Sequence, residues 1–354
     1  MSQIYSNLKF LGFSEQLQAL RERRLVAPVH IRIKPINHCN HSCWYCAYRT
    51  DQLQLGDEID LKDRIPEGKM MEIAADVVSM GVKAVTFSGG GEPLLYKTLP
   101  EVIDVLAAGG VRVATLTNGS NLRGRMAEAF ARHGTWIRVS LDAWDDASYA
   151  KARGVPEGAF SRLLTNMRDF AALGSKCVLG TSLIVGHANH DRIYDICSML
   201  KDIGIDHVKV AAAVVANDGA ENNAYHRKII DTVSAQIERA RGLDDAKFHV
   251  VNHYHETDER FEKDYHTCPF LQFLTVIGAD QCVYTCQDKA YTEGGRLGSI
   301  KERSFKDFWF SDDNLARVYG LDPAVDCRHH CVAHRKNLAI AEYLRLDDDH
   351  RHFV

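Results

Sequence analysis

The chain has 354 residues, of which 45% are hydrophobic and 25% charged, a balance typical of a globular protein with an ample core. Its net charge of −4 argues against nucleic acid or an anionic membrane as a partner. The N-terminus lacks a signal-peptide pattern and no apolar run approaches the roughly 18 residues of a membrane span, so we expect a cytoplasmic protein.

Short β-branched runs alternate with amphipathic segments from residue 30 to about residue 240. The expected strands lie at 30–35, 84–89, 112–118, 136–142, 177–186 and 207–215, and the expected helices between them at 69–81, 99–110, 122–134, 160–174 and 191–204. This alternation predicts βαβ units and a parallel sheet. Six units are too few for an eight-stranded barrel, so the predicted fold class is α/β, a partial (β/α)6 TIM-like barrel. Its chemistry should collect at the carboxyl ends of the strands.

The pattern changes after this region. Residues 243–267 are charged and contain several histidines; we interpret them as a solvated linker, with a metal site as the alternative. A hairpin is expected over 274–286 with its turn near 279–281, then a short strand and a helix over 299–314 and a final helix over 331–346. The predicted domains are an N-terminal extension (1–29), a barrel (30–242), and a linker with a small α+β domain (243–354).

Three cysteines, Cys39, Cys43 and Cys46, follow the first expected strand with the spacing C-x3-C-x2-C. A loop at that position can hold a metal cluster over the mouth of a barrel. Three thiolates suit a four-iron four-sulfur (4Fe–4S) cluster in which one iron has no protein ligand. The alternative is a zinc site with His38 or His41 as the fourth ligand.

This segment resembles the signature of the radical S-adenosylmethionine (radical SAM) enzymes, C-x3-C-x-Φ-C with an aromatic residue at Φ. Cys39, Cys43, Tyr45 and Cys46 match it at every position. The resemblance implies that the unligated iron binds the amino and carboxylate groups of S-adenosylmethionine. An electron from the cluster then yields a 5′-deoxyadenosyl radical, which abstracts a hydrogen atom. Tyr45 would lie against the adenine.

The second expected strand ends in Gly89, Gly90, Gly91 and Glu92, which resemble the GGE motif of the family. Consecutive glycines let the backbone approach a ligand closely, and free carbonyls with a carboxylate can receive the ammonium group of the cofactor. The alternative is a simple turn between strand and helix.

Two further strand ends resemble the segments that approach the methionyl and ribose parts of the cofactor in this family. They contain Asn118 and Ser140. For Asn118 an ordinary Asn-Gly turn is the alternative. By analogy, the backbone at 184–186 would flank the adenine.

Four C-terminal cysteines resemble the ligands of the extension called SPASM, or of its shorter form, twitch. The usual turn glycine is Gln281 here and the usual proline is Thr285, which suggests a different turn conformation without loss of ligation. Leu321 stands where SPASM carries a further cysteine, so we expect the twitch form with one auxiliary 4Fe–4S cluster; structural zinc is the alternative. The four expected ligands are Cys268, Cys286, Cys327 and Cys331.

The remaining cysteines have weaker interpretations. Cys282 is expected to be a non-ligand, and it is a weak candidate for a hydrogen donor to the substrate. Cys177 and Cys197 are expected to be core residues. Three histidines near the last cysteines are expected to be solvated or to support ligands: His329, His330 and His334.

The resemblance implies an S-adenosylmethionine-dependent oxidoreductase that acts on a small carbohydrate-like or aminocyclitol-type molecule, with net oxidation or epimerisation as the outcome. Its partners would be the substrate and a reductant such as flavodoxin or ferredoxin. One alternative is a maturase that oxidises or cross-links peptide side chains; the short extension 1–29 argues against its peptide-binding domain. An alternative of another class is a zinc-bearing binding protein without catalysis.

Overall fold

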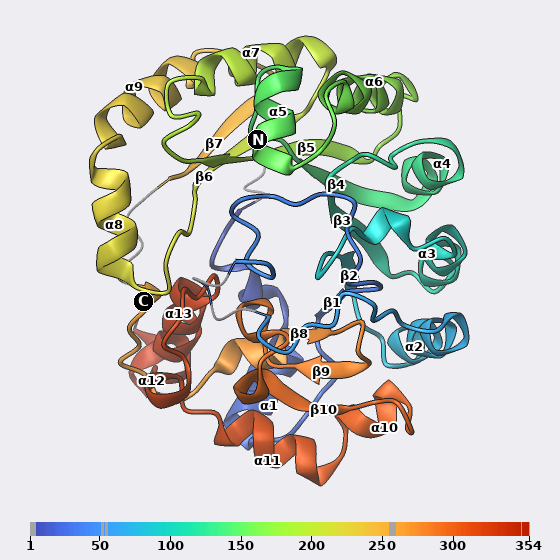
Figure 1. Ribbon diagram of the computed structural model, residues 1–354. Helices are drawn as coiled ribbons and strands as arrows, with labels where there is room; N and C mark the ends of the chain where they lie inside the picture. Colours follow the sequence, from blue (N-terminus) through green and yellow to red (C-terminus); the bar gives the residue numbers. More distant parts are fainter. Residues whose placement is uncertain (1–4, 51–52, 54–55, 255–259, 348, 354) are drawn as a thin grey trace.

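One ten-stranded sheet organises the chain, with the strand order β10-β9-β8-β1-β2-β3-β4-β5-β6-β7 (Figure 1). The computed structural model describes residues 5–50, 53, 56–254, 260–347 and 349–353. The strands are β1 (His30–Ile33), β2 (Ala84–Phe87), β3 (Arg112–Thr117), β4 (Gly134–Ser140), β5 (Val178–Val185), β6 (His207–Ala212), β7 (His249–His253), β8 (Leu274–Ile277), β9 (Cys282–Tyr284) and β10 (Arg296–Ser299).

Helices cover the outer face of the parallel strands β1 to β7 (Figure 1). The helices of this part are α2 (Glu67–Ser79), α3 (Leu99–Ala108), α4 (Gly124–His133), α5 (Asp146–Arg153), α6 (Ala159–Ala172), α7 (Ile193–Ile203), α8 (Gly219–Arg227) and α9 (Ile230–Arg241). The others are α1 (Ser14–Glu22), α10 (Phe305–Trp309), α11 (Asp312–Gly320), α12 (Pro323–Asp326) and α13 (His334–Leu344).

Alternation along the strands separates a core face from an inner face. Ile31 and Ile33 of β1 are fully buried in the main hydrophobic core together with Ile137 of β4 and Val208 of β6. Because neighbouring residues of a strand point to opposite faces, Arg32 and Lys34 point to the inner face. The helices pack against the apolar face of the sheet, and polar side chains line its inner face.

The predicted fold class is confirmed, since β1 to β6 fall on the six predicted strands. The structure adds β7, which pairs in parallel with β6 and comes from the segment that we interpreted as a linker. That interpretation is wrong for His249–His253, because a run of only two valines was too short to signal a strand; residues 255–259 of the same segment lie outside the described part. Helix α5 was also not predicted.

The C-terminal extension continues the same sheet. Strand β8 pairs in parallel with β1, and the predicted hairpin is formed by β8 and β9, which are antiparallel. In its turn Gln281 has φ 61°, the left-handed region that glycine favours. The backbone at this position therefore has a conformation typical of glycine, and the chain carries glutamine there at a conformational cost.

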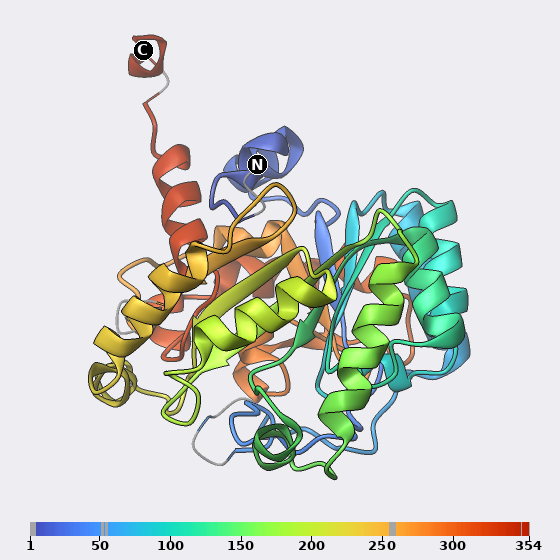
Figure 2. The same ribbon diagram turned by 90° about the horizontal axis from the view of Figure 1, so that it is seen from above.

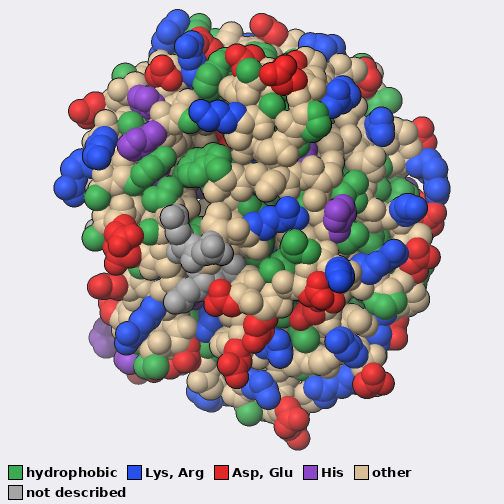
Figure 3. All heavy atoms as spheres, viewed as in Figure 1, with side chains coloured by type: hydrophobic (Ala, Val, Ile, Leu, Met, Phe, Trp, Pro, Cys, Tyr) green, Lys and Arg blue, Asp and Glu red, His purple; other side chains and the backbone are tan. Residues whose placement is uncertain are grey.

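Acidic and basic side chains are interspersed around the rim of the face in Figure 3, in keeping with the small net charge. None of the helices in the described ranges is long and apolar enough to cross a membrane.

Candidate active site

The loop after β1 carries Cys39, Cys43 and Cys46 at the carboxyl end of the parallel strands. Figure 2 shows this loop and the N-terminal segment at opposite ends of the strands. The three thiols are partly buried. Burial raises the pKa of Cys39 to about 11, and burial also raises the pKa of Cys46; in both cases the neighbouring Cys43 adds to the shift. The loop thus brings the three thiols close enough to interact electrostatically.

Helix α5 holds this loop in place. Its first turn is fixed because the Asp145 carboxylate accepts from the Ser148 backbone N–H at 2.7 Å, and the Ser148 hydroxyl accepts from the Asp145 N–H at 3.1 Å. At the other end of the helix the Ser42 N–H donates to the Arg153 carbonyl at 2.7 Å. Gly154 follows with φ 60°, and a Cβ there would lie 3.0 Å from Ser42.

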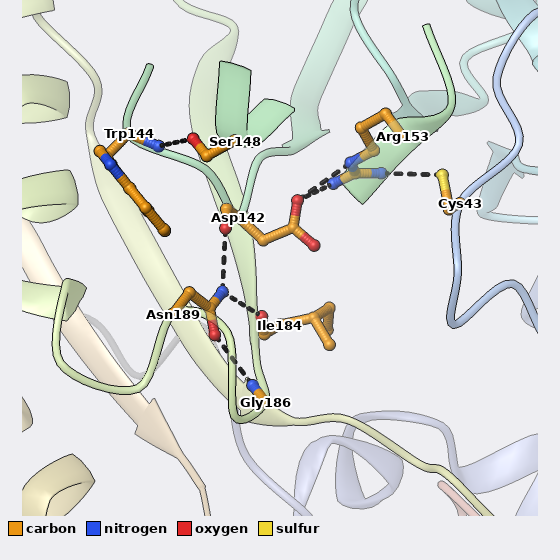
Figure 4. A network of polar contacts seen from close by, with 8 residues as sticks. All are labelled: Cys43, Asp142, Trp144, Ser148, Arg153, Ile184, Gly186 and Asn189. Carbon is orange, nitrogen blue, oxygen red and sulfur yellow. Dashed lines mark hydrogen bonds and ion pairs between the residues drawn. The ribbon is translucent and has the colours of Figure 1, made fainter. Parts of the chain in front are cut away.

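Arg153 and Asp142 form a buried ion pair that reaches the cysteine loop (Figure 4). The guanidinium donates to Asp142 Oδ1 from Nε at 2.9 Å and from Nη2 at 2.7 Å. It also donates from Nη1 to the Cys43 sulfur at 3.3 Å. Its Cζ lies 5.3 Å from the centroid of the Tyr45 ring. A fixed positive charge therefore supports one of the three thiols.

Asn189 extends the network toward the backbone at 184–186. Its Nδ2 donates to the Asp142 and Ile184 carbonyls, both at 2.9 Å, and its Oδ1 accepts from the Gly186 N–H at 2.9 Å (Figure 4). The backbone segment predicted to flank an adenine is thus fixed to the strand end that carries Asp142.

Close packing requires all three glycines after β2, and for Gly90 and Gly91 the packing is against the residues just before Cys39. A Cβ at Gly91 would lie 2.0 Å from the His38 carbonyl oxygen, and one at Gly90 would lie 2.1 Å from Asn37 Oδ1. A Cβ at Gly89 would meet the Gly91 carbonyl oxygen at 2.1 Å. Glycine lets this strand end approach the residues just before Cys39.

Gly91→Ala is expected to displace the cysteine loop, because its methyl group cannot coexist with the His38 carbonyl. We expect less iron in the anaerobically purified variant, measured by iron analysis and the absorbance near 400 nm. Gly68→Ala is the matched control, since a Cβ at Gly68 meets nothing within 4 Å. Wild-type iron content in Gly91→Ala would contradict the steric argument.

Glu92 lies at the same strand end, but its carboxylate is already occupied by this chain. It accepts from the Leu94 N–H at 3.0 Å, the Thr117 hydroxyl at 2.5 Å and the Asn118 N–H at 2.7 Å. Glu92 is 2% exposed, and burial raises its pKa to about 7. In this structure Glu92 joins the ends of β2 and β3.

The other predicted cofactor residues lie on the cysteine loop or at the ends of β3 and β4. Asn118 donates to Asn40 Oδ1 at 2.8 Å and lies 4.0 Å from the Cys39 sulfur. Ser140 ends β4 on the inner face, opposite Ser182 of β5. The hydroxyl of Tyr45 is buried without a hydrogen bond, beneath Arg153. Asn118 and Ser140 thus lie at neighbouring strand ends, and Asn118 contacts the loop that carries Tyr45.

The C-terminal extension brings its four predicted ligands together. A small cavity is lined by all four, with Lys263, Asn337 and His329 among its other residues. The Asn337 amide donates to the Cys268 sulfur at 3.5 Å. Burial raises the pKa of Cys286 well above its ordinary value, and the other three thiols add to this shift: Cys268, Cys327 and Cys331.

The spacing of the thiols favours clusters over single zinc ions. Tetrahedral zinc with bonds of 2.3 Å holds its sulfurs about 3.8 Å apart. In the described residues, no three cysteines have their sulfurs within 4.8 Å of one another. A cluster places its thiolates on different metal atoms and so tolerates wider spacing. One compact group of ligand atoms is present, formed by Cys286, Asp288 and His329.

Lys34 lies between the two cysteine groups. It is fully buried and donates from Nζ to the Tyr48 hydroxyl at 2.7 Å and to the Gly89 carbonyl. Its ammonium also lies 5.9 Å from the ring of Tyr291 in the extension. Burial lowers its pKa to about 7, whereas the thiols of Cys46 and Cys286 act in the opposite direction. Lys34 Nζ can therefore hold or release a proton near neutral pH.

A family model for the radical SAM superfamily matches residues 33–200, the part that carries the cysteine loop and the strand ends described above. Residues 33–200 form a domain of the radical SAM superfamily. Its predicted membership, read from Cys39, Cys43, Tyr45 and Cys46, is confirmed.

Similar proteins support this radical SAM assignment. An S-adenosylmethionine-dependent nucleotide dehydratase of Lacinutrix mariniflava is 32% identical over 113 residues, which are 32% of this chain but only 23% of that protein. The Fe-coproporphyrin III synthase of Methanosarcina barkeri is 24% identical over 81% of this chain and 75% of its own length. SuiB of Streptococcus suis bound to S-adenosylmethionine has a TM-score of 0.60 at 16% identity, covering 84% of this chain and 69% of SuiB, which shows a shared fold.

The three remaining cysteines lie outside the two cysteine groups, whereas His329 lines the cavity of the C-terminal cysteines. Cys282 is buried in an apolar cluster with Tyr284 and Tyr291 and does not line the cavity of the C-terminal cysteines. Cys177 and Cys197 are buried in the main core. Among the histidines, His329 is buried rather than solvated, at 9% exposure. His330 and His334 also interact with neighbouring groups: His330 with Arg260 and Phe261, and His334 with Tyr265.

Sequence reasoning missed Arg153, Asp142, Asn189 and Lys34. Asp142 carries a signal, since a lone acid directly follows a buried strand. Lys34 carries another, because a lysine within a hydrophobic strand end is rare without a partner. No sequence signal marks Arg153 or Asn189, because their partners are remote in sequence.

Proposed function

We propose that the protein abstracts a hydrogen atom from a small hydroxylated molecule, in an S-adenosylmethionine-dependent reaction that results in net oxidation. The observation that carries this proposal is the cavity lined by Cys268, Cys286, Cys327 and Cys331, joined through β8 to the strand that leads to the first cysteine loop. A second group of cysteines can hold a cluster that accepts an electron. Net oxidation requires such an acceptor, whereas a redox-neutral reaction does not.

The residues fit two clusters. Cys39, Cys43 and Cys46 would hold the first and leave one iron open, and the four C-terminal cysteines would hold the second. When bound, these groups would supply reductive cleavage of the cofactor and a one-electron acceptor. Such clusters and free thiols persist in a reducing compartment, so we propose the cytoplasm, with flavodoxin or ferredoxin as the reductant.

The protein's own residues would orient the cofactor and manage charge. Arg153 would keep a positive charge against Cys43, and the backbone of 89–91 with that of 184–186 would border the cofactor. Ser140 would reach it from the inner face. Lys34 Nζ, placed between the thiol groups, would hold or release the proton that oxidation sets free.

Iron analysis with a C-terminal variant tests this proposal. Anaerobically purified protein should contain about eight irons per chain, and Cys327→Ala should contain about four. Cys327→Ala should still form 5′-deoxyadenosine from S-adenosylmethionine and dithionite, because the first cysteine loop is intact.

Three outcomes would contradict the proposal. A colourless wild-type protein with bound zinc would indicate a binding protein. Iron without 5′-deoxyadenosine formation would remove the catalytic claim. A Cys327→Ala protein that retains all its iron would remove the second cluster.

A further inference from the structure

The inner face of β4, β5 and β6 carries a compact set of polar side chains. Arg138 is paired in register with Gly180 of β5, which is in turn paired with His207 of β6. In the next row Ser182 is paired with both Ser140 and Lys209. The residues between them, such as Ile137 and Val208, are buried in the core beneath the helices. Arg138 and Lys209 therefore both point to the inner face.

Several cations of the inner region have counter-charges in the C-terminal extension. Against the effect of burial, the Asp288 carboxylate raises the pKa of Arg32, Lys34 and Lys336. The thiol of Cys286 adds to this effect on Arg32 and Lys34, and that of Cys331 adds to it on Lys336. Thiolates that hold a cluster would balance these three charges.

Arg138 and Lys209 have no such counter-charge. Neither forms an ion pair with a carboxylate in the described part of the chain, and Arg138 Nε is buried without a hydrogen bond. Burial and neighbouring cations lower the pKa of Lys209 to about 8. Those neighbours are Arg138, Arg32, Arg260 and Lys336. Unpaired charge in a partly buried site is costly, so an anion is expected there.

The ring of Tyr5 lies near both cations, and the centroid of the Trp136 ring also lies 5.1 Å from Arg138 Cζ. Arg138 Cζ lies 5.3 Å and Lys209 Nζ 5.7 Å from the centroid of the Tyr5 ring, and the Tyr5 hydroxyl lies 3.2 Å from His207 Nε2. A neutral ring attracts cations but carries no net charge. Two like charges against one ring still repel each other, so Tyr5 leaves the excess charge uncompensated.

The hydroxyls of Ser140 and Ser182 add neutral donors beside the two cations. Both side chains are partly buried, and neither hydroxyl has a hydrogen-bond partner within the described residues. Two cations and two free hydroxyls in adjacent rows match the acceptor oxygens of a carboxylate or phosphate.

We infer that Arg138 and Lys209 bind an oxyanion of the substrate, a carboxylate or phosphate group, on the inner face of the barrel. This inference rests on the proposed function, which makes the bound molecule a substrate. Ser140, expected at the cofactor, is two residues or about 7 Å along the strand from Arg138. A substrate held by its anionic group at Arg138 would thus extend inside the barrel along β4 toward Ser140.

Calorimetric titration of the anaerobic holoprotein tests the site, with inorganic pyrophosphate and citrate as probes and myo-inositol as the neutral control. We expect saturable binding of at least one anion and none of myo-inositol. Arg138→Gln and Lys209→Gln should each weaken binding about tenfold, the effect of losing one charge-assisted hydrogen bond. Arg138→Lys should lose less affinity for the anion, since the variant keeps the positive charge. Arg168→Gln removes the same charge from an exposed position on α6 and should change the affinity less than twofold.

Binding of pyrophosphate alone would indicate a phosphate group, and binding of citrate alone a carboxylate. The inference would be overturned if neither anion showed saturable binding. It would also be overturned if both glutamine variants kept the wild-type affinity. Melting temperatures distinguish an anion-binding role from a structural role. Removing an unpaired cation should leave the melting temperature unchanged or raise it. A marked fall in both glutamine variants would also overturn the inference. Formation of 5′-deoxyadenosine by the wild type is measured separately, so its failure would remove the proposed function and leave the anion site standing.

Discussion

Cys43→Ala is expected to abolish formation of 5′-deoxyadenosine and to leave about four irons per chain instead of about eight. Cys43 is the central thiol of the loop after β1, and its sulfur accepts the Arg153 hydrogen bond at 3.3 Å. Without it only two thiols remain there, too few to hold a cluster with one open iron. Iron analysis and chromatography of the S-adenosylmethionine products measure both effects.

Cys282→Ala is the matched control, because Cys282 lies in an apolar cluster and does not line the cavity of the C-terminal cysteines. It should keep its iron and its cleavage activity. Undiminished cleavage in Cys43→Ala would show that the loop is not the site of the chemistry.

Asp142→Ala is expected to destabilise the fold by about 3–5 kcal/mol, since it leaves the Arg153 guanidinium buried without its counter-ion. Both side chains are almost fully buried, at 3% and 2% exposure. In a chain of this length the melting temperature should fall by roughly 4–7 °C. Because the Arg153 guanidinium would no longer be held in position, the cysteine loop should also become less ordered, and the iron content should fall.

Glu101→Ala provides the comparison, because Glu101 pairs with Arg125 at 2.6 Å on the surface. Such an exposed pair contributes less than about 1 kcal/mol. Asp142→Ala combined with Arg153→Met should recover part of the loss, because the unpaired charge is gone. Equal melting temperatures for Asp142→Ala and Glu101→Ala would contradict the importance of burial.

The sequence was most informative where the signal was local. Alternating β-branched and amphipathic runs predicted β1 to β6, and the spacing of Cys39, Cys43 and Cys46 predicted the family. Strand β7 was missed because two valines among polar residues do not form a recognisable strand, and it is the neighbouring edge of β6 that stabilises it.

Side-chain partnerships depended on the fold and could not be read in advance. Glu92 appeared free to receive a ligand, but Thr117 at the end of β3 and Asn118 just after it supply two of its three donors. Arg153 lies 110 residues from Cys43, and only the path of α5 brings them together. Likewise the charge excess at Arg138 and Lys209 emerges only when β4 and β6 are placed on either side of β5.

The parallel pairing of β8 with β1 has a consequence for electron transfer. Because β1 leads into the first cysteine loop and β8 into the hairpin that precedes Cys286, hydrogen bonds of one sheet join the two thiol groups. The tunnelling distance between two bound clusters would therefore be set by strand register and would not vary with domain motion. For the same reason a truncation before β8 would uncover the edge of β1 and expose it to aggregation, so the extension is not a detachable module.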